Sequence, residues 1–340
     1  MEKKGVLLIN LGTPDSPSVE DVRKYLNEFL MDERVIDAPF IIRYAIVKFF
    51  ILPKRPESSA EAYRKIWTSE GSPLLVYSKK ILEKVKSRVS IPVELAMRYG
   101  NPSVESAIKT LASQGIEQLF LIPLFPQYAM STFESAVKHV EKTIRKTGSG
   151  FRLLVKEPFY NDSLYINSLA GRIREFIGDS RDHLIFSYHG LPERHIRKTD
   201  PTGRHCLKTP DCCKIESPAH RFCYRHQCFQ TTRLVASKLG LNENEYTIAF
   251  QSRLGVDKWL EPSTTSILES LPKRGIKRVK VVCPSFITDC IETLEEIGIR
   301  ARETFLNAGG ENLDLITCLN DYPLWIDAIT SWINDFVENH

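Results

Sequence analysis

Short, nearly unbroken apolar runs alternate with longer amphipathic stretches along the whole sequence. The runs lie at residues 6–11, 93–99, 118–125, 153–155, 184–188, 246–251 and 279–283, with a weaker one at 313–318. Apolar runs this short are typical of strands that are buried on both faces of a parallel sheet. Helical periodicity fills the gaps, for example at 19–30, 74–89, 103–112, 131–146 and 229–239. This alternation predicts a doubly wound α/β fold.

The length of 340 residues suits one large α/β unit or two lobes of about 150 residues each. The sequence Lys-Thr-Gly-Ser-Gly at 146–150 is the best candidate for a boundary. It predicts an N-terminal lobe (1–150), a C-terminal lobe (151–320) and a C-terminal helix (321–340). With 42% apolar and 26% charged residues, the chain is not disordered, collagenous or a coiled coil. A net charge of +4 gives no indication of a polyanion-binding protein.

Polar and aromatic residues gather where the predicted strands end. Ligands of open α/β sheets bind beyond the carboxyl ends of the strands, so we expect a cleft there, bordered by Arg98, Tyr99, Gln127 and Tyr128. His189 ends one strand just before a Gly-Leu-Pro turn. An imidazole with a pKa near 6.5 suits proton transfer at neutral pH. A histidine that only caps the turn is the alternative.

Two glutamates stand near the start of a predicted helix. Asp289 and Glu292 have the spacing of a capping box, in which the glutamate needs no catalytic role. Glu292 and Glu296 are four residues apart and flank the apolar stripe, so both could face a cleft. Arg300 is placed to pair with Glu296. Two carboxylates with a histidine could bind a divalent cation or relay protons.

Residues 191–227 break the periodic pattern. Five of the eight cysteines lie here or just beyond, at Cys206, Cys212, Cys213, Cys223 and Cys228. A chain this long needs no disulfide framework, so the crowding indicates a metal centre.

The most apolar stretch, 40–52, is interrupted by Arg43 and Lys48. It is too short and too charged to span a bilayer, which takes about 20 apolar residues. No targeting segment is recognisable, and we expect a cytoplasmic protein.

Six motifs, in order along the chain, resemble those of ferrochelatase, the enzyme that inserts ferrous iron into protoporphyrin IX in the last step of haem synthesis. They are GVLLINLGTP (5–14), AMRYGNP (96–102), LFPQYAMST (124–132), FSYHGLP (186–192), QSRLGVDKWLEP (251–262) and CPSFITDCIETLEEI (283–297). The resemblance implies a chelatase fold of two Rossmann-like lobes, each with a parallel four-stranded sheet flanked by helices.

The resemblance also implies roles for single residues. His189 becomes the proton acceptor or a metal ligand, and Glu292, backed by Glu296, guides the metal. The substrate contacts it implies are Arg98, Tyr99, Gln127 and Tyr128. For Arg98 and Tyr99, a salt-bridge network is an equally good interpretation.

Ferrochelatases with a [2Fe–2S] cluster include some with ligands in an internal segment, and the insertion at 193–228 is similar to that type. The implied ligands are Cys206, Cys213, Cys223 and Cys228, with Cys212 as an alternative to Cys213.

Stretch 40–52 falls where protoporphyrin-type members have a hydrophobic lip. Its basic residues, Arg43, Lys48, Lys54 and Arg55, suit the anionic inner leaflet, each contributing about 1 kcal/mol. We therefore expect peripheral contact with the cytoplasmic face of the inner membrane. An internal helix is the alternative, and one helix can serve both purposes on different faces.

Other functions compete with this interpretation. Another metal or coproporphyrin could be the substrate, although the apolar lip argues against a ring with two further carboxylates. Segment 194–226 could instead be a zinc-bound nucleic-acid module, since it holds eight Lys/Arg against three Asp/Glu. Its cysteines lack the Cys-x2-Cys spacing usual for zinc, so we expect no nucleic-acid partner.

Overall fold

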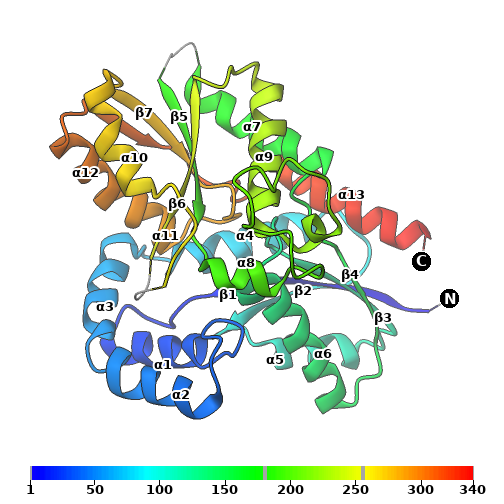
Figure 1. Cartoon of the computed structure of the whole chain (residues 1–340). Helices are drawn as coiled ribbons and strands as arrows, with labels where there is room; N and C mark the ends of the chain where they lie inside the picture. Colours follow the sequence, from blue (N-terminus) through cyan, green and yellow to red (C-terminus); the bar gives the residue numbers. More distant parts are fainter. Residues whose placement is uncertain (1, 179–181, 254–256, 340) are drawn as a thin grey trace. The chain divides into compact units, whose positions relative to one another are not determined.

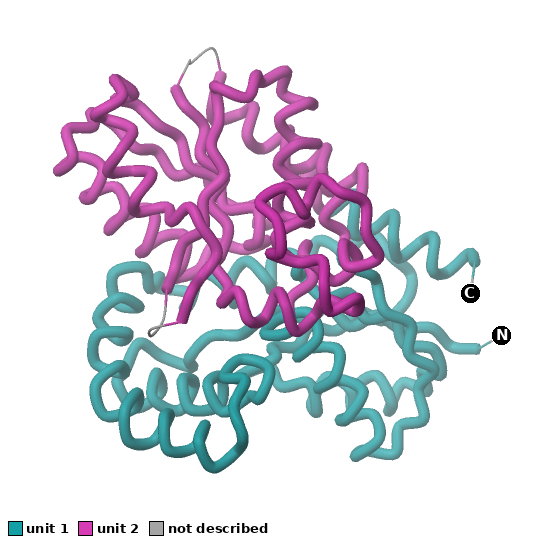
Figure 2. The backbone as a smooth tube through the Cα atoms, in the orientation of Figure 1, with its two compact units in different colours: residues 1–125, 130–158, 326–340 teal, residues 126–129, 159–325 magenta. Residues whose placement is uncertain are grey.

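The computed structural model describes residues 2–178, 182–253 and 257–339. The chain divides into two compact units, coloured teal and magenta in Figure 2. Unit 1 comprises Met1–Phe125, Met130–Pro158 and Ile326–His340, and unit 2 comprises Pro126–Ala129 and Phe159–Trp325.

Unit 1 is built on a parallel four-stranded sheet in the order β2-β1-β3-β4 (Figure 1). Its strands are β1 (Lys4–Gly12), β2 (Val93–Tyr99), β3 (Gln118–Pro123) and β4 (Arg152–Val155). Its α-helices are α1 (Val19–Leu30), α2 (Phe40–Ala45), α3 (Arg55–Ile66), α4 (Pro73–Lys86), α5 (Val104–Ser113) and α6 (Ser135–Thr147), and its π-helical turns are η1 (Ile46–Ile51) and η2 (Met130–Glu134).

The sequence pattern explains this architecture. Val6, Leu7, Leu8 and Ile9 of the central strand have no exposed surface, as an unbroken apolar run between two helical layers requires. The side chains of Ser18 and Ser103 accept hydrogen bonds from backbone N–H groups in the first turns of α1 and α5. The predicted α/β fold is therefore confirmed in this unit.

Unit 2 repeats the same topology, in the order β6-β5-β7-β8. Its strands are β5 (His183–His189), β6 (Tyr246–Gln251), β7 (Arg278–Val282) and β8 (Asn312–Leu315). Its helices are α7 (Ser163–Ile177), α8 (Glu193–Lys198), η3 (Pro218–Phe222), α9 (Tyr224–Leu239), α10 (Thr264–Ser270), η4 (Pro272–Arg274), α11 (Ile291–Leu294), the π-helical turn η5 (Glu296–Ala301) and α12 (Arg302–Asn307). Two parallel four-stranded sheets flanked by helices match the predicted fold class.

The division of the chain differs from the predicted boundary at 146–150. β4 (Arg152–Val155) pairs with β3 and completes the first sheet, so unit 1 continues to Pro158. Pro126–Ala129, expected in the first lobe, belongs to unit 2. The C-terminal helix α13 (Pro323–Asn339) begins in unit 2 and continues in unit 1. Strand pairing, which a linker composition does not reveal, decides these limits.

The cysteine-rich segment contains more regular structure than its sequence predicts. α8 and η3 lie within it, and α9 begins at Tyr224, ahead of the predicted helix at 229–239. Cys223 is the N-cap residue of α9, and Cys228 lies inside the helix. The cysteines of the segment are thus spread over a loop and the first turns of one helix.

Candidate active site

His189 is the last residue of β5 and is half-buried. Its Nδ1 atom lies 2.6 Å from the carbonyl oxygen of Gly190. A carbonyl only accepts hydrogen bonds, so Nδ1 must carry the proton. In the neutral ring Nε2 then has a free lone pair, which is the form needed for a base or a metal ligand. The ring of Phe286 lies 6.2 Å away, centroid to centroid.

Gly190 lets the chain pass close to the neighbouring strand. Its N–H donates to the carbonyl of Gln251 at 2.6 Å. A Cβ atom here would lie 2.8 Å from that oxygen and 3.0 Å from the carbonyl oxygen of Ser252. Only glycine fits, which explains the Gly that follows the histidine in the motif.

Glu292 does not act as a cap, contrary to the capping-box interpretation. Cys290 is the N-cap residue of α11, and Thr293 supplies the reciprocal contact, accepting from the Cys290 N–H at 3.0 Å. Asp289 is buried and accepts from the Thr293 hydroxyl and from the side chain of Asn320. The carboxylate of Glu292 is therefore not needed for the helix start.

Glu296 lies in the same electrostatic environment as Glu292 and His189. Burial raises the pKa of the Glu296 carboxyl, and the charge of Glu292 raises it further. Ser252, His189 and Arg300 act in the opposite direction. The predicted ion pair is present, with Arg300 Nη2 3.3 Å from Glu296 Oε1. His189, Glu292 and Glu296 thus lie near enough for their charges to interact, but within the described residues they do not form a preformed site for a metal ion.

Two residues of this site were missed by sequence reasoning. Gln251 pairs with His189 across β5 and β6, and its Nε2 donates to the backbone carbonyl of Glu292 at 2.8 Å. Ser252 has a φ of +60° and donates its hydroxyl to Glu296. The only sequence signal was their position at a strand end. Residues 254–256 of the same motif lie outside the described residues.

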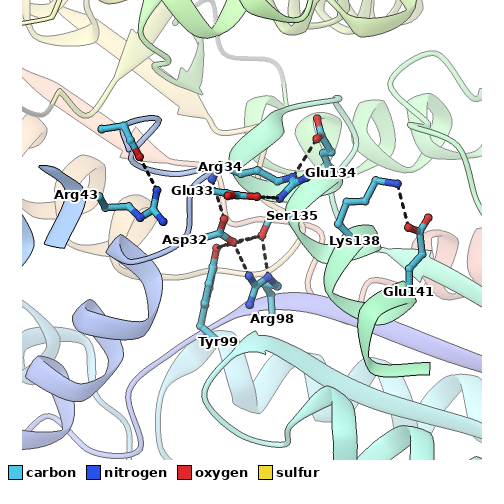
Figure 3. A network of polar contacts seen from close by, with 11 residues as sticks. Asp32, Glu33, Arg34, Arg43, Arg98, Tyr99, Glu134, Ser135, Lys138 and Glu141 are labelled. Atoms are coloured by element: carbon cyan, nitrogen blue, oxygen red, sulfur yellow. Dashed lines mark hydrogen bonds and ion pairs between the residues drawn. The ribbon is translucent and has the colours of Figure 1, made fainter. Parts of the chain in front are cut away.

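Arg98 and Tyr99 end β2 in unit 1 and take part in a polar network around Asp32 (Figure 3). Arg98 forms an ion pair with Asp32, and its Nε donates to Ser135 at 2.7 Å. The Tyr99 hydroxyl donates to Asp32 at 2.9 Å, and the Tyr99 side chain has no exposed surface. Arg98 and Tyr99 therefore take part in a salt-bridge network, as one of the two interpretations predicts.

Asp32 remains ionised in this network. Burial alone would raise the pKa of its carboxyl, but hydrogen bonds from Ser135 and the Arg34 backbone, with the charge of Arg98, lower it overall. Arg34 in turn contacts Glu134 at 2.9 Å, as Figure 3 shows. The network joins the segment after α1 to the start of α6.

Gln127 and Tyr128 are held within unit 2 by α9. The Gln127 amide donates to the Thr231 hydroxyl at 3.2 Å, and Gln227 accepts from the Tyr128 N–H at 2.6 Å. Gln127 is buried, whereas Tyr128 is half-exposed and has its ring edge-on to Phe222.

The cysteines of the insertion are all free thiols, and four of the five are buried. Interaction with the Cys223 thiol and burial raise the pKa of the Cys213 thiol. Interaction with the Cys206 thiol, together with burial, raises the pKa of the Cys223 thiol to about 12. A clustered set of buried thiols is the donor set that an iron–sulfur cluster takes. In the described part of the chain, no group of three or more Cys, His, Asp or Glu is arranged to hold a single metal ion.

The stretch 40–52 shows two faces. Val47 and Leu52 are buried, whereas apolar side chains on the other face are exposed by 43–81%: Phe40, Ile41, Ile42, Tyr44, Phe49 and Phe50. Arg43 is buried and donates to the carbonyl of Ala38 at 2.7 Å, so it does not present its charge as expected. None of the described helices is long and apolar enough to cross a membrane.

The sequence of the chain matches a known protein family over nearly its whole length. The family model described as Ferrochelatase matches residues 3–336. The ferrochelatase of Azotobacter vinelandii is 49% identical over 332 residues, which cover 97% of this chain and 98% of that protein. The ferrochelatase of Stutzerimonas stutzeri is 48% identical over 331 residues, 97% of each chain. The chain belongs to the ferrochelatase family.

Solved structures support the same fold. SirB from Bacillus subtilis with Fe3+ matches with a TM-score of 0.57 at 14% identity, covering 98% of this chain and 95% of that one. The sirohydrochlorin chelatase SirB from Bacillus subtilis subspecies spizizenii, in complex with cobalt, matches with a TM-score of 0.55 at 12% identity, covering 99% and 96%. The ferrochelatase-family chain therefore has a chelatase fold.

Proposed function

We propose that this chain inserts ferrous iron into protoporphyrin IX and so forms protohaem in the last step of haem biosynthesis. Membership in the ferrochelatase family supports iron insertion into a porphyrin. The observation that carries the assignment of roles is the imidazole of His189, whose Nδ1–H is held by Gly190 while Nε2 is left as a base beside two carboxylates.

The reaction requires a proton acceptor and a metal guide. Two pyrrole N–H protons leave as one Fe²⁺ enters, so the charge of the macrocycle complex is unchanged. His189 Nε2 takes a pyrrole proton or ligates the incoming metal. Glu292 attracts the cation and helps to replace its water ligands, because carboxylate oxygens suit hard divalent ions. Glu296 has a raised pKa, which makes it a better proton acceptor than an exposed glutamate.

We further propose that Arg98, Tyr99, Gln127 and Tyr128 support porphyrin binding. Tyr128 offers a half-exposed ring edge to the macrocycle. Arg98 supplies positive charge for a propionate, although Asp32 offsets part of it. Tyr99 and Gln127 are buried and would act by fixing their neighbours.

We propose that the insertion binds a [2Fe–2S] cluster through Cys206, Cys213, Cys223 and Cys228, with Cys212 as the alternative to Cys213. The mutual contacts of Cys206, Cys213 and Cys223 support this set. Such a cluster would supply a structural or sensing centre, because metal insertion moves no electrons overall. The basic residues of the segment would then offset the negative charge of the thiolates rather than bind nucleic acid, as the contact of Arg225 with the Cys213 sulfur at 3.4 Å illustrates.

We also propose that the exposed face of 40–52 contacts the anionic surface of a membrane. Six exposed apolar side chains form this face, and Lys48 and Lys54 remain available to anionic headgroups. An apolar surface of this kind favours the more hydrophobic protoporphyrin over coproporphyrin.

The deciding experiment is an anaerobic assay with purified protein, Fe²⁺, detergent and either protoporphyrin IX or coproporphyrin. We expect haem from protoporphyrin IX, and zinc can replace iron as a convenient probe. Turnover of coproporphyrin but not of protoporphyrin IX would show that coproporphyrin is the substrate. Absence of any metalloporphyrin would refute the proposed activity.

A further inference from the structure

One tyrosine in unit 2 directly follows a cysteine of the insertion and contacts the strand end that carries His189. Tyr224 is the first residue of α9, directly after Cys223. Its hydroxyl donates to the backbone carbonyl of His189 at 2.9 Å. It also lies 2.7 Å from the hydroxyl of Ser285, and it is near enough to the Cys228 thiol to influence the pKa of that thiol.

These contacts are made in the interior of the unit. Tyr224 is 5% exposed and Cys228 is fully buried. A buried hydroxyl is strongly directional because it has no water with which to exchange partners. A displacement of Cys228 or of the first turn of α9 would therefore change the geometry of the hydrogen bond from the Tyr224 hydroxyl to the carbonyl of His189.

The position of His189 is also set by its pairing with Gln251 across β5 and β6, and its imidazole is oriented by the carbonyl of Gly190. Neither contact involves the cysteine segment, and the pairing of β5 with β7 already ends at Phe186. The bond from Tyr224 is the link between the carbonyl of His189 and the segment that carries Cys223 and Cys228. A second bond, between the hydroxyls of Tyr188 and Thr232 at 2.8 Å, joins the same strand to α9, but only the bond from Tyr224 reaches the backbone of His189 itself among the hydrogen bonds of these two side chains.

We propose that Tyr224 is a positioning residue that couples the cysteine centre to His189. The inference rests on the proposed function, since it takes His189 as the base and the cysteines as cluster ligands. When the ligands hold the start of α9 in place, Tyr224 fixes the carbonyl of His189 and so the direction of its imidazole. When the cluster is lost, α9 loosens and the base moves out of line. A cluster held by these cysteines would then report the supply of iron to the site, and the insertion reaction itself would require no electron from it.

Tyr224→Phe tests the positioning because it removes only the hydroxyl. Tyr25→Phe is the matched control, since Tyr25 is also buried and its hydroxyl also donates to a backbone carbonyl, that of Gly12, at 3.2 Å. We expect Tyr224→Phe to retain the visible absorption and the porphyrin affinity of the wild type while kcat falls about tenfold or more, because a shift of about 1 Å can lower a rate about 100-fold. Tyr25→Phe should keep the wild-type kcat, although the thermal stability of the two variants should fall by similar amounts.

Coupling to the cysteines is tested by adding Cys206→Ser, which removes a ligand that does not contact Tyr224. The ligand change should lower kcat in the wild-type background and cause little further loss in Tyr224→Phe. If Cys206→Ser does not fold, iron is stripped from both proteins with a chelator and the same comparison is made. If the two substitutions lower kcat by factors that multiply in the double variant, the two positions act independently and the coupling is refuted.

The outcomes separate this inference from the function on which it rests. A wild-type protein that forms no metalloporphyrin refutes the proposed activity. A colourless but active wild type refutes the cluster, and with it the coupling. An active, coloured wild type with an unchanged kcat in Tyr224→Phe refutes this inference alone.

Discussion

The Nδ1 atom of His189 lies 2.6 Å from the carbonyl oxygen of Gly190, and this contact determines which nitrogen of the imidazole is available for chemistry. The carbonyl selects the Nδ1–H tautomer, so that Nε2 carries the lone pair. Gly190 cannot be replaced without moving the chain, because a side chain would meet the carbonyl of Gln251. The motif Ser-Tyr-His-Gly thus encodes both the imidazole that we propose as the base and its orientation.

Replacement of His189 by Ala is expected to abolish nearly all metal insertion while the protein still folds. The side chain is half-buried at a strand end, and its loss leaves no large cavity in the core. His183 begins the same strand and bonds to Thr247 at 2.8 Å, so His183→Gln is the matched control and should retain activity. Full turnover by His189→Ala in the anaerobic assay would remove this residue from the mechanism.

Glu292→Gln should separate catalysis from stability. Cys290 and Thr293 cap α11, so loss of the Glu292 charge should change the free energy of unfolding by no more than about 0.5 kcal/mol, as for a surface substitution. Turnover should fall and the KM for the metal should rise. Thr293→Val is the opposite case, expected to cost about 1 kcal/mol through loss of the cap. A stability loss in Glu292→Gln with normal kinetics would return Glu292 to a structural role.

How far the sequence could predict this site depends on the kind of contact. His189, Glu292 and Glu296 follow from strand ends and helix spacing, which are local patterns. Arg98 was open between a substrate contact and a salt bridge because its partner, Asp32, is distant in sequence and not predicted by any period. Gln251 was missed for the same reason, since its importance comes from the register that places it opposite His189.

The fold shows the same limit. The strand runs were found because buried parallel strands are locally apolar, whereas the boundary at 146–150 was misplaced because β4 is short and only pairing with β3 assigns it to unit 1. The capping box predicted for Asp289 and Glu292 is formed one residue later, because the hydroxyl of Thr293 accepts the hydrogen bond from the Cys290 N–H.

The free energy of unfolding should decrease in acid, and His139 in unit 1 should contribute to this decrease. Burial and then the charge of Arg98 lower the pKa of its imidazole to about 4, with Asp32 partly opposing them. The unfolded chain therefore binds the proton more tightly, with a pKa near 6.5. The contribution of His139 is complete above pH 6.5 and is lost as the pH falls toward 4.

His139→Gln should accordingly flatten the pH dependence of the thermal midpoint between pH 6.5 and 4. Lys138→Gln changes the charge of an exposed neighbour and should keep the wild-type slope. Equal slopes in the wild type and His139→Gln, measured by circular dichroism, would show that the imidazole is not held neutral.

Attachment to anionic liposomes should depend on the exposed face of 40–52. Phe49 and Phe50 are 69% and 73% exposed, so changing both to Ser removes apolar surface without opening the core. Leu164→Ser with Leu324→Ser removes two exposed apolar side chains elsewhere and serves as the control. Co-sedimentation should drop for the first pair only, and it should weaken with salt. Unchanged sedimentation of the Phe49/Phe50 variant would exclude these two side chains as the membrane contact.

The cysteine set can be resolved by colour. Cys213 contacts Cys223, and the pKa of the Cys228 thiol, raised mainly by burial, also responds to Cys223 and Cys213. The Cys212 sulfur instead accepts from the backbone N–H of Leu207 at 3.4 Å. These contacts favour Cys213 over Cys212 as the fourth ligand.

We therefore expect Cys213→Ser to bleach the visible absorption and Cys212→Ser to keep it, with Cys206, Cys223 and Cys228 behaving like Cys213. Cys318→Ser is the control, because Cys318 is buried near Asp289 and away from the insertion. Iron and sulfide analysis of anaerobically prepared protein should agree with the colour, since a [2Fe–2S] centre needs four protein ligands and inorganic sulfide. Zinc in place of iron and sulfide, or full colour in a Cys223→Ser/Cys228→Ser double variant, would exclude the cluster and leave the chelatase site unaffected.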